Sequence, residues 1–367
     1  VYKRQRKGFL KYAGKTTGEI LDGLTQNKQL KAVLLGQWGD YGLPPSQSSF
    51  AIQAMVANHY MYGGCYPIGG SAEFADTIIP PIEELGGQVL VRAEVDEVIV
   101  ENGRAKGVKM KDGRTFNAPI VISNAGFSNT MDKLLPKSAQ RTDHSLDKLG
   151  LEPSGGHICL YLGFKKTPEE LELPKTNLWI YPGYDHDKQF EAYSKDANAA
   201  FPVVYISFPA AKDPDFQNRF PGKSTIEIIT MMPWEWVEKW EKGKWMKRGE
   251  DYDAWKENLS QRLLKELYKH VPLTEGQVDH YELSTPLSTK HFANYPKGEL
   301  YGLSHTPKRF EQRKLGVRTD IKGFFMTGQD SVSCGVAGGM FGGVLTASAI
   351  LTKNVMGTAF KWCKEND

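Results

Sequence analysis

The chain has 367 residues, of which 40% are hydrophobic and 24% are charged, and its formal charge at pH 7 is +3. This is an ordinary globular composition in a chain too long for one simple core, so we expect two intertwined domains. The 46 basic and 43 acidic side chains are interleaved, which argues against a nucleic-acid partner. Neither a secretory signal nor an apolar run of membrane-spanning length is visible. The chain begins without an initiator methionine, as a fragment or processed product would.

The cysteines are too scattered to form a recognisable framework. Cys65, Cys159, Cys334 and Cys363 show no metal-ligand spacing, and the eight histidines are equally dispersed. We therefore expect free thiols and no metal site. The sequence also lacks a Gly-x-Ser-x-Gly elbow, a His-Glu-x-x-His motif and a P-loop, so a bound cofactor is a better candidate for the chemistry than side chains alone.

The first part of the chain predicts helices. Residues 1–35 are basic and helix-like, residues 36–45 form a loop rich in glycine and proline, and serines at 46–49 can cap a helix from about Phe50 to Tyr60. We assign residues 1–62 to the helical part of a substrate domain.

Residues 63–126 read as the second part of a dinucleotide-binding domain. A glycine-rich loop leads into a predicted helix at 72–85, followed by a strand at 88–92 and a β-meander at 95–116 whose Asn102-Gly103 pair predicts a hairpin turn. A buried strand at 120–122 then leads to Asn124 and Ala125. The first part of such a domain, with Gly-x-Gly-x-x-Gly between a strand and a helix, is not found in residues 1–60.

The middle of the chain, residues 127–320, predicts a separate substrate-binding domain with a mixed sheet. Residues 203–208 and 225–230 favour strands, and residues 253–270 favour an amphipathic helix. Five tryptophans gather between Trp234 and Trp255. They could line an apolar pocket, form an aromatic core, or contact a membrane.

The C-terminal part, residues 321–355, predicts a strand, a polar turn and a glycine-rich helix, before a tail at 356–367. The strand ends near Met326 and is followed by Gly328 and Asp330, and glycines at 335, 338, 339, 342 and 343 open the helix. A helix N-terminus and closely approaching backbone suit an anionic or electron-rich ring system with a diphosphate. The alternative is a buried helix that packs tightly through its glycines.

Several segments resemble one known group. Residues 66–70, 86–89, 121–126 and 327–330 resemble the phytoene desaturase and carotenoid isomerase superfamily of FAD enzymes. Residues 39–42, 58–60, 208–214 and 219–225 resemble its retinol saturase branch. The resemblance runs from about Leu34 to Leu351 and implies a split, Rossmann-like α/β domain of the amine oxidase type with an inserted substrate domain.

The resemblance also implies roles for particular residues. Val95 would touch the adenine of FAD through its backbone, and Asn124 and Ala125 would lie near the flavin. The ribityl-diphosphate would be held by Gly328 and Asp330. The backbone N–H groups that would face the flavin edge are those of Gly338, Gly339 and Met340.

The expected reaction is reduction of a conjugated C=C bond in a retinoid or a related polyene, with NAD or NADP as a candidate electron source. The candidates for the proton donor are Tyr66, His59, Cys334 and Tyr301, each with a structural role as the alternative. A desaturase, a cis–trans isomerase, or a non-catalytic prenyl-binding protein of the Rab GDP-dissociation inhibitor type are the other functions considered. By resemblance, we expect peripheral contact with a membrane, that of the endoplasmic reticulum in a eukaryote.

Overall fold

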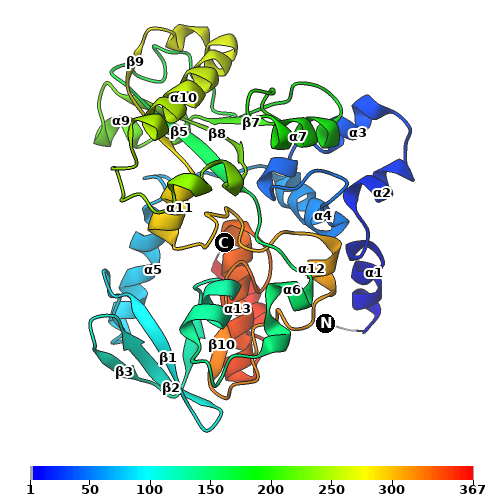
Figure 1. Ribbon diagram of the computed structural model, residues 1–367, viewed down its shortest axis with the longest axis vertical. Helices are drawn as coiled ribbons and strands as arrows, with labels where there is room; N and C mark the ends of the chain where they lie inside the picture. Colours follow the sequence, from blue (N-terminus) through cyan, green and yellow to red (C-terminus); the bar gives the residue numbers. More distant parts are fainter. Residues whose placement is uncertain (1–2, 367) are drawn as a thin grey trace.

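The computed structural model describes residues 3–366, which form an upper and a lower part with the chain passing between them several times (Figure 1). The upper part is built on a five-stranded sheet in the order β6-β7-β8-β5-β9. These strands are β5 (Gly156–Phe164), β6 (Leu178–Ile180), β7 (Val204–Ser207), β8 (Ser224–Met232) and β9 (Val278–Ser284). All four pairings are antiparallel, so the prediction of a mixed sheet is wrong in this respect. Its strands are joined by hairpins and excursions that reverse direction rather than by βαβ crossovers.

The core of the upper part lies between this sheet and the long helix α10 (Glu250–His270). The inward residues alternate along the strands, with Ile158, Leu160 and Leu162 on β5 all buried. Helix α10 contributes leucines at helical spacing, and Leu263 and Leu267 are fully buried. The predicted strands at 203–208 and 225–230 and the helix at 253–270 are confirmed.

Four helices from the first 60 residues pack beside the large sheet. They are α1 (Lys3–Ala13), α2 (Thr17–Asp22), α3 (Lys28–Leu34) and α4 (Phe50–His59). The Ser49 side chain accepts a hydrogen bond from the Ala51 N–H and so caps α4, as the serines before it predict. Trp38, Tyr41 and Ile52 form a second buried cluster with Val203 of the upper part.

The lower part contains the predicted meander of β1 (Val95–Glu101), β2 (Arg104–Met110) and β3 (Thr115–Asn117). Asn102 and Gly103 both have positive φ, as a two-residue hairpin turn of type I′ requires. Strands β4 (Val121–Ser123) and β10 (Phe324–Met326) pair in parallel beside it.

Helix α13 (Gly335–Leu351) follows β10, and α14 (Val355–Asn366) turns back against it. Helix α5 (Glu73–Glu84) lies above the meander in Figure 1, and Gly86, whose φ is +80°, follows its C-cap residue Leu85. The described helices that complete the fold are short: α6 (Leu146–Leu149), α7 (His186–Lys195), α8 (Pro209–Lys212), α9 (Phe216–Arg219), α11 (Pro286–Ala293) and α12 (Pro307–Glu311). Among residues 3–366, no single helix is long and apolar enough to span a membrane. Helices α13 and α14 together have the length and composition of a span, but the chain bends by 120° between them.

The predicted strand at 88–92 does not form. No described strand pairs with these residues, and Val89, Leu90 and Val91 are exposed. A strand exists only where its backbone N–H and C=O groups find partners, so the apolar sequence alone was not sufficient here.

Candidate functional site

The site is built around the carboxyl ends of two strands that are far apart in the sequence. In the parallel pair, Ser123 of β4 lies opposite Met326 of β10, so the residues that follow each strand meet at one edge. A Cβ on Gly328 would lie 1.8 Å from the Asn124 Oδ1 atom, so only glycine allows this approach. Ligands of open α/β sheets bind at such carboxyl ends.

The glycines of α13 divide into two sets. A Cβ on Gly338 would collide with the Ser333 carbonyl, and one on Gly342 would lie 2.6 Å from the Gly328 backbone nitrogen, so these glycines allow close packing. A Cβ on Gly339 or Gly343 would meet nothing within 4 Å. The latter pair therefore leaves open space along the helix, while Met340 beside them is 65% exposed.

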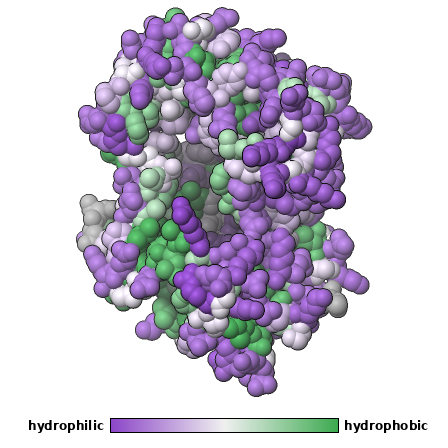
Figure 2. Space-filling view, turned by 60° about the vertical axis from the view of Figure 1, so that its left-hand side comes forward, coloured by the Kyte–Doolittle hydropathy of each residue, from purple (hydrophilic) through white to green (hydrophobic). Residues whose placement is uncertain are grey.

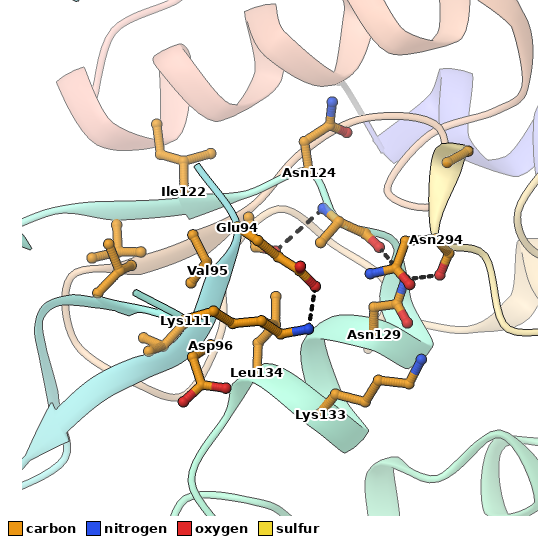
Figure 3. A pocket seen from close by; sticks show the side chains of 16 residues that line it. Glu94, Val95, Asp96, Lys111, Ile122, Asn124, Asn129, Lys133, Leu134 and Asn294 are labelled. Carbon is orange, nitrogen blue, oxygen red and sulfur yellow. Dashed lines mark hydrogen bonds and ion pairs between the residues drawn. The ribbon is translucent and has the colours of Figure 1, made fainter. Parts of the chain in front are cut away.

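A cavity of about 570 Å³ opens between the meander and the end of β4 (Figure 3). Val95 lines it from β1, and Asn124 and Ala125 line it from the end of β4. Lys133 brings a positive charge to its wall, while Glu94 at the other side is paired with Lys111 at 2.5 Å. The volume is within the range of sites for small molecules, about 300–1,000 Å³.

Several buried polar atoms around this edge have no hydrogen-bond partner. They are the Asn129 Oδ1 atom in the cavity wall and the hydroxyl oxygens of Thr327 and Ser331 on either side of Gly328. The Asn129 amide nitrogen is fully used, since it donates to the carbonyls of Ala125 and Asn294. Buried polar atoms usually find partners, so these oxygens are consistent with a polar ligand.

Asp330 has a different environment from the one its position suggested. It is 5% exposed, and its two carboxylate oxygens accept hydrogen bonds from the N–H groups of Phe127 and Leu303 at 2.7 and 2.8 Å. Cβ atoms on Gly126 and Gly302 would also press on this carboxylate. Asp330 thus ties three separate segments together, and its predicted contact with the ribityl-diphosphate stays a prediction.

The described residues fit the cofactor that the sequence predicts. Val95, Asn124 and Ala125 share one cavity, Gly328 adjoins Asn124, and the open face at Gly339 begins one turn into α13. No side chain caps the N-terminus of α13, so N–H groups of its first turn remain available to a partner. The individual contacts of Gly338, Gly339 and Met340 with a flavin stay predictions.

Three of the four candidate proton donors gather at one place. His59 is near enough to Asp40 to lower its pKa through charge. Tyr301 donates its hydroxyl hydrogen to the Gly39 carbonyl at 2.9 Å, and the Cys334 sulfur lies 3.5 Å from the Asp40 carbonyl oxygen. Burial raises the pKa of the Cys334 thiol to about 12 and that of the Tyr301 phenol well above its usual value. Neither group releases a proton readily.

Tyr66 lies apart from that group. Its ring carries the Lys212 ammonium 5.5 Å from the centroid, and burial raises the pKa of its hydroxyl, with Glu227 adding to the effect. This is a polar corner on the outer face of the large sheet. Its contacts are consistent with the structural alternative as well as with a role in the site.

The tryptophans mostly form an aromatic core. Trp234 and Trp240 are less than 10% exposed and pack with Tyr252, and Trp255 lies against the same group. Trp245 instead stacks on His291 near the exposed Phe292. The four cysteines are free thiols, as predicted, and no group of three or more metal-ligating side chains occurs in the part of the chain that the structure describes.

Comparison with known sequences gives a consistent result. No family model matches the chain. It is 35% identical to an all-trans-retinol 13,14-reductase of Danio rerio over 97% of this chain and 61% of that protein. An inactive all-trans-retinol 13,14-reductase of the same species is 33% identical, over 94% of this chain and 58% of the relative. A chloroplastic prolycopene isomerase of Arabidopsis thaliana is 27% identical over 81% of this chain and 47% of the isomerase. The chain thus spans less than two thirds of the length of these relatives.

Solved structures share the fold at lower sequence identity. An oxidoreductase from Methanosarcina mazei superposes with a TM-score of 0.60 at 17% identity, over 92% of this chain and 68% of the other. A double mutant of putrescine oxidase gives a TM-score of 0.60 at 13% identity, over 94% of this chain and 69% of the oxidase. The predicted α/β fold class of the amine oxidase type is confirmed. In sequence the chain is similar to all-trans-retinol 13,14-reductases and to a prolycopene isomerase, and in fold it is similar to a putrescine oxidase.

Proposed function

We propose that this protein is an FAD-dependent oxidoreductase that reduces a C=C bond of an apolar polyene, most simply a retinoid. The observation that carries the proposal is the meeting of three features at one edge. These are the cavity lined by Val95 and Asn124, the close approach of Gly328, and the open glycine face of α13. The sequence similarity to retinol 13,14-reductases supports the choice of substrate.

In this proposal the two ends of FAD are held by different elements. Val95 on β1 would contact the adenine through its backbone, and Asn124 and Ala125, in the wall of the same cavity, would lie toward the flavin. The backbone at Gly328 would let the linker pass the carboxyl ends of β4 and β10, where the unpaired hydroxyls of Thr327 and Ser331 would be available to it. The N–H groups of the first turn of α13 would face the ring, and the positive end of the helix dipole would favour negative charge there.

When bound and reduced, FAD supplies the hydride for saturation of a C=C bond. The role of this chain is then to hold an apolar substrate beside the ring and to exclude water. Figure 2 shows the surface hollowed between the upper and lower parts, with hydrophobic side chains gathered beside the hollow. Its roof would be the outer face of the large sheet, where Trp179 and Tyr205 pack with their ring centroids 4.7 Å apart. NADH or NADPH is proposed as the electron source on the resemblance alone.

The experiment is flavin binding followed by product analysis. The protein, purified in its native full-length form, should carry a flavin absorption spectrum, and its reduced form should be reoxidised under anaerobic conditions by all-trans-retinol with formation of a dihydro product. If the protein contains no flavin when purified and binds none when flavin is added, the proposal is refuted. Reoxidation without a saturated product would refute the reaction but not the cofactor.

A redox-neutral isomerase is the second candidate, because a prolycopene isomerase is also similar in sequence. An isomerase would change the geometry of a polyene with no net consumption of reducing equivalents. Product analysis by mass distinguishes the two, since saturation adds two hydrogens per molecule and isomerisation adds none.

Contact with a membrane surface would give an apolar substrate access to the hollow. Met61, Tyr62 and Ile68, between α4 and α5, are 74%, 97% and 66% exposed, and they offer apolar area beside the upper and lower parts. We propose that this segment touches lipid, in the endoplasmic reticulum of a eukaryotic cell. Flotation with neutral vesicles should weaken when Met61 and Ile68 are both changed to serine. Unchanged flotation would refute the assignment.

A further inference from the structure

Asp40 is a carboxylic acid in an unusual place. It ends the short 3-10 helix η1 (Trp38–Asp40), between Gly39 and the buried Tyr41. Its Oδ2 atom is buried and has no hydrogen-bond partner. A buried carboxylate without full pairing is costly, so the position favours a protonated acid.

Phenol groups from several elements surround this carboxyl. Tyr60 hydrogen-bonds to it from η2 (Tyr60–Tyr62). The other groups whose pKa values respond to the Asp40 charge are Tyr41, Tyr181, Tyr205, Tyr301 and Cys334. The basic side chain whose charge lowers the pKa of Asp40 is His59. A carboxyl among phenols, with one unpaired oxygen, is a cluster that packing alone does not require.

The cluster is fixed to the N-terminus of α13. Cys334 is the N-cap residue of that helix, and its sulfur lies 3.5 Å from the Asp40 carbonyl oxygen. The Cys334 N–H donates to the His305 Nε2 atom at 3.0 Å, which holds the same junction from a third segment. Asp40 is therefore placed beside the helix whose open glycine face is proposed to hold the flavin ring.

Among the groups at this junction, Asp40 has the acidity that a proton donor needs. Burial raises the pKa of Asp40 to about 6, against smaller opposing effects of the Tyr60 hydroxyl and His59. A general acid works best with a pKa near the working pH. Tyr301 and Cys334 hold their protons too tightly, and Tyr301 already donates its hydrogen to Gly39.

We propose that the carboxyl group of Asp40 is the acid that protonates the polyene during C=C reduction, an inference that rests on the proposed function. One carbon of the double bond accepts hydride, with its electron pair, from reduced flavin. The π electrons form the second C–H bond with the proton of Asp40, which is left as a carboxylate. The flavin is oxidised, the substrate gains two hydrogens, and Asp40 regains its proton from water by way of the Tyr60 hydroxyl, since Tyr60 is 39% exposed.

The first test measures the carboxyl itself and needs no turnover. Infrared difference spectra of the full-length protein, recorded over a pH series, should contain a protonated-carboxyl C=O band that titrates near pH 6 and is absent in Asp40→Asn. Tyr60→Phe should move this titration to higher pH, because it removes a hydrogen bond that stabilises the charged form of Asp40 in the parent. Identical spectra for the parent and Asp40→Asn would overturn the inference.

The second test follows reoxidation of the reduced, flavin-loaded protein by all-trans-retinol in single turnovers. Asp40→Asn should keep flavin affinity and lower the rate of saturation by about 10²–10⁴-fold, the usual contribution of a general acid. In the parent, the rate should fall as pH rises through about 6, because the acid form is lost. Asp132→Asn, which removes another carboxyl of raised pKa away from this junction, is the matched control and should react like the parent.

The outcomes separate the two proposals. A parent that binds flavin but saturates no polyene refutes the proposed function, and with it the role of Asp40. A parent that saturates retinol with the same rate and pH profile as Asp40→Asn leaves the function intact and overturns this inference alone. A third outcome is that Asp40→Asn loses its bound flavin together with its rate, while Tyr60→Phe leaves the pH profile unchanged. That result would assign Asp40 to packing and would also overturn this inference.

Discussion

The large sheet and the parallel pair β4–β10 both consist of apolar strands, but they bury their side chains very differently. On the large sheet, Ile158, Ile226 and Ile228 are fully buried against α10. On the parallel pair, Ile122 is 48% exposed, and α13 beside it exposes Val336 and Met340. An apolar strand is therefore not a buried strand until another element covers it. The upper part carries one large core, whereas the lower part has small buried clusters, such as that of Val98 and Phe324, and offers apolar and open surface around the site.

The largest expected effect is in the core of the upper part. Ile228→Ala should lower the free energy of unfolding by about 4 kcal/mol, because it removes a fully buried side chain and leaves a cavity. The matched change on the parallel pair, Ile122→Ala, should cost about 1 kcal/mol, since half of that side chain is already in water. Denaturant unfolding of both variants measures the difference, and equal losses would break the comparison.

Asp330→Ala is expected to have the next largest effect, and it examines how the site is held together. The Phe127 and Leu303 N–H groups would lose a charged acceptor, which should cost about 3 kcal/mol in the presence or absence of flavin. The sequence also predicts a loss of FAD affinity of roughly 10- to 150-fold. Asp330→Asn, which keeps the shape of the side chain and one good acceptor, should lose less stability and less FAD affinity. Normal melting of Asp330→Ala, together with weak flavin binding, would show that the contact with the ligand dominates.

The smallest expected effects separate the two kinds of glycine on α13. Gly342→Ala should cost about 2 kcal/mol, because its Cβ would collide with the backbone of Gly328. Gly339→Ala should stabilise the apo-protein by up to about 1 kcal/mol, because its Cβ enters open space and alanine favours helix. In a flavin titration, Gly339→Ala should weaken flavin binding more than Gly342→Ala does, since the open face at Gly339 is where the ring is proposed to lie. Unchanged flavin affinity in Gly339→Ala would remove this face from the site.

The sequence predicted best those elements that have their own local signals. The Asn102-Gly103 turn, the serine cap of α4 and the leucine periodicity of α10 each specify their structure within a few residues. The strand expected at 88–92 has the right composition but no pairing partner among the described residues. Its failure reflects a dependence on tertiary neighbours that no local pattern reveals.

The same distinction applies to the site. The glycine pattern at 335–343 identified the close approach of α13, but it could not separate packing glycines from those that leave space, since that depends on what lies opposite. The sequence pointed to Asp330 as a site residue, but it could not predict its partners Phe127 and Leu303, because local motif spacing does not show which distant segments meet in the fold. Asp40 was noticed only within a glycine-flanked segment, because all but one of its surrounding phenols come from four other places in the chain.

The bond between the Phe127 N–H and Asp330 joins residues 203 positions apart, and it has a consequence for how the chain folds. Closing so long a loop of disordered chain costs about 5 kcal/mol in entropy, more than one such contact returns. The intervening upper part removes most of this cost if it folds first, because its own sheet brings its two ends together. The upper part then folds first, and the site around β4 and β10 forms afterwards. During synthesis, the parallel strand pair can close only after β10 has left the ribosome, long after β4 and the whole upper part have emerged.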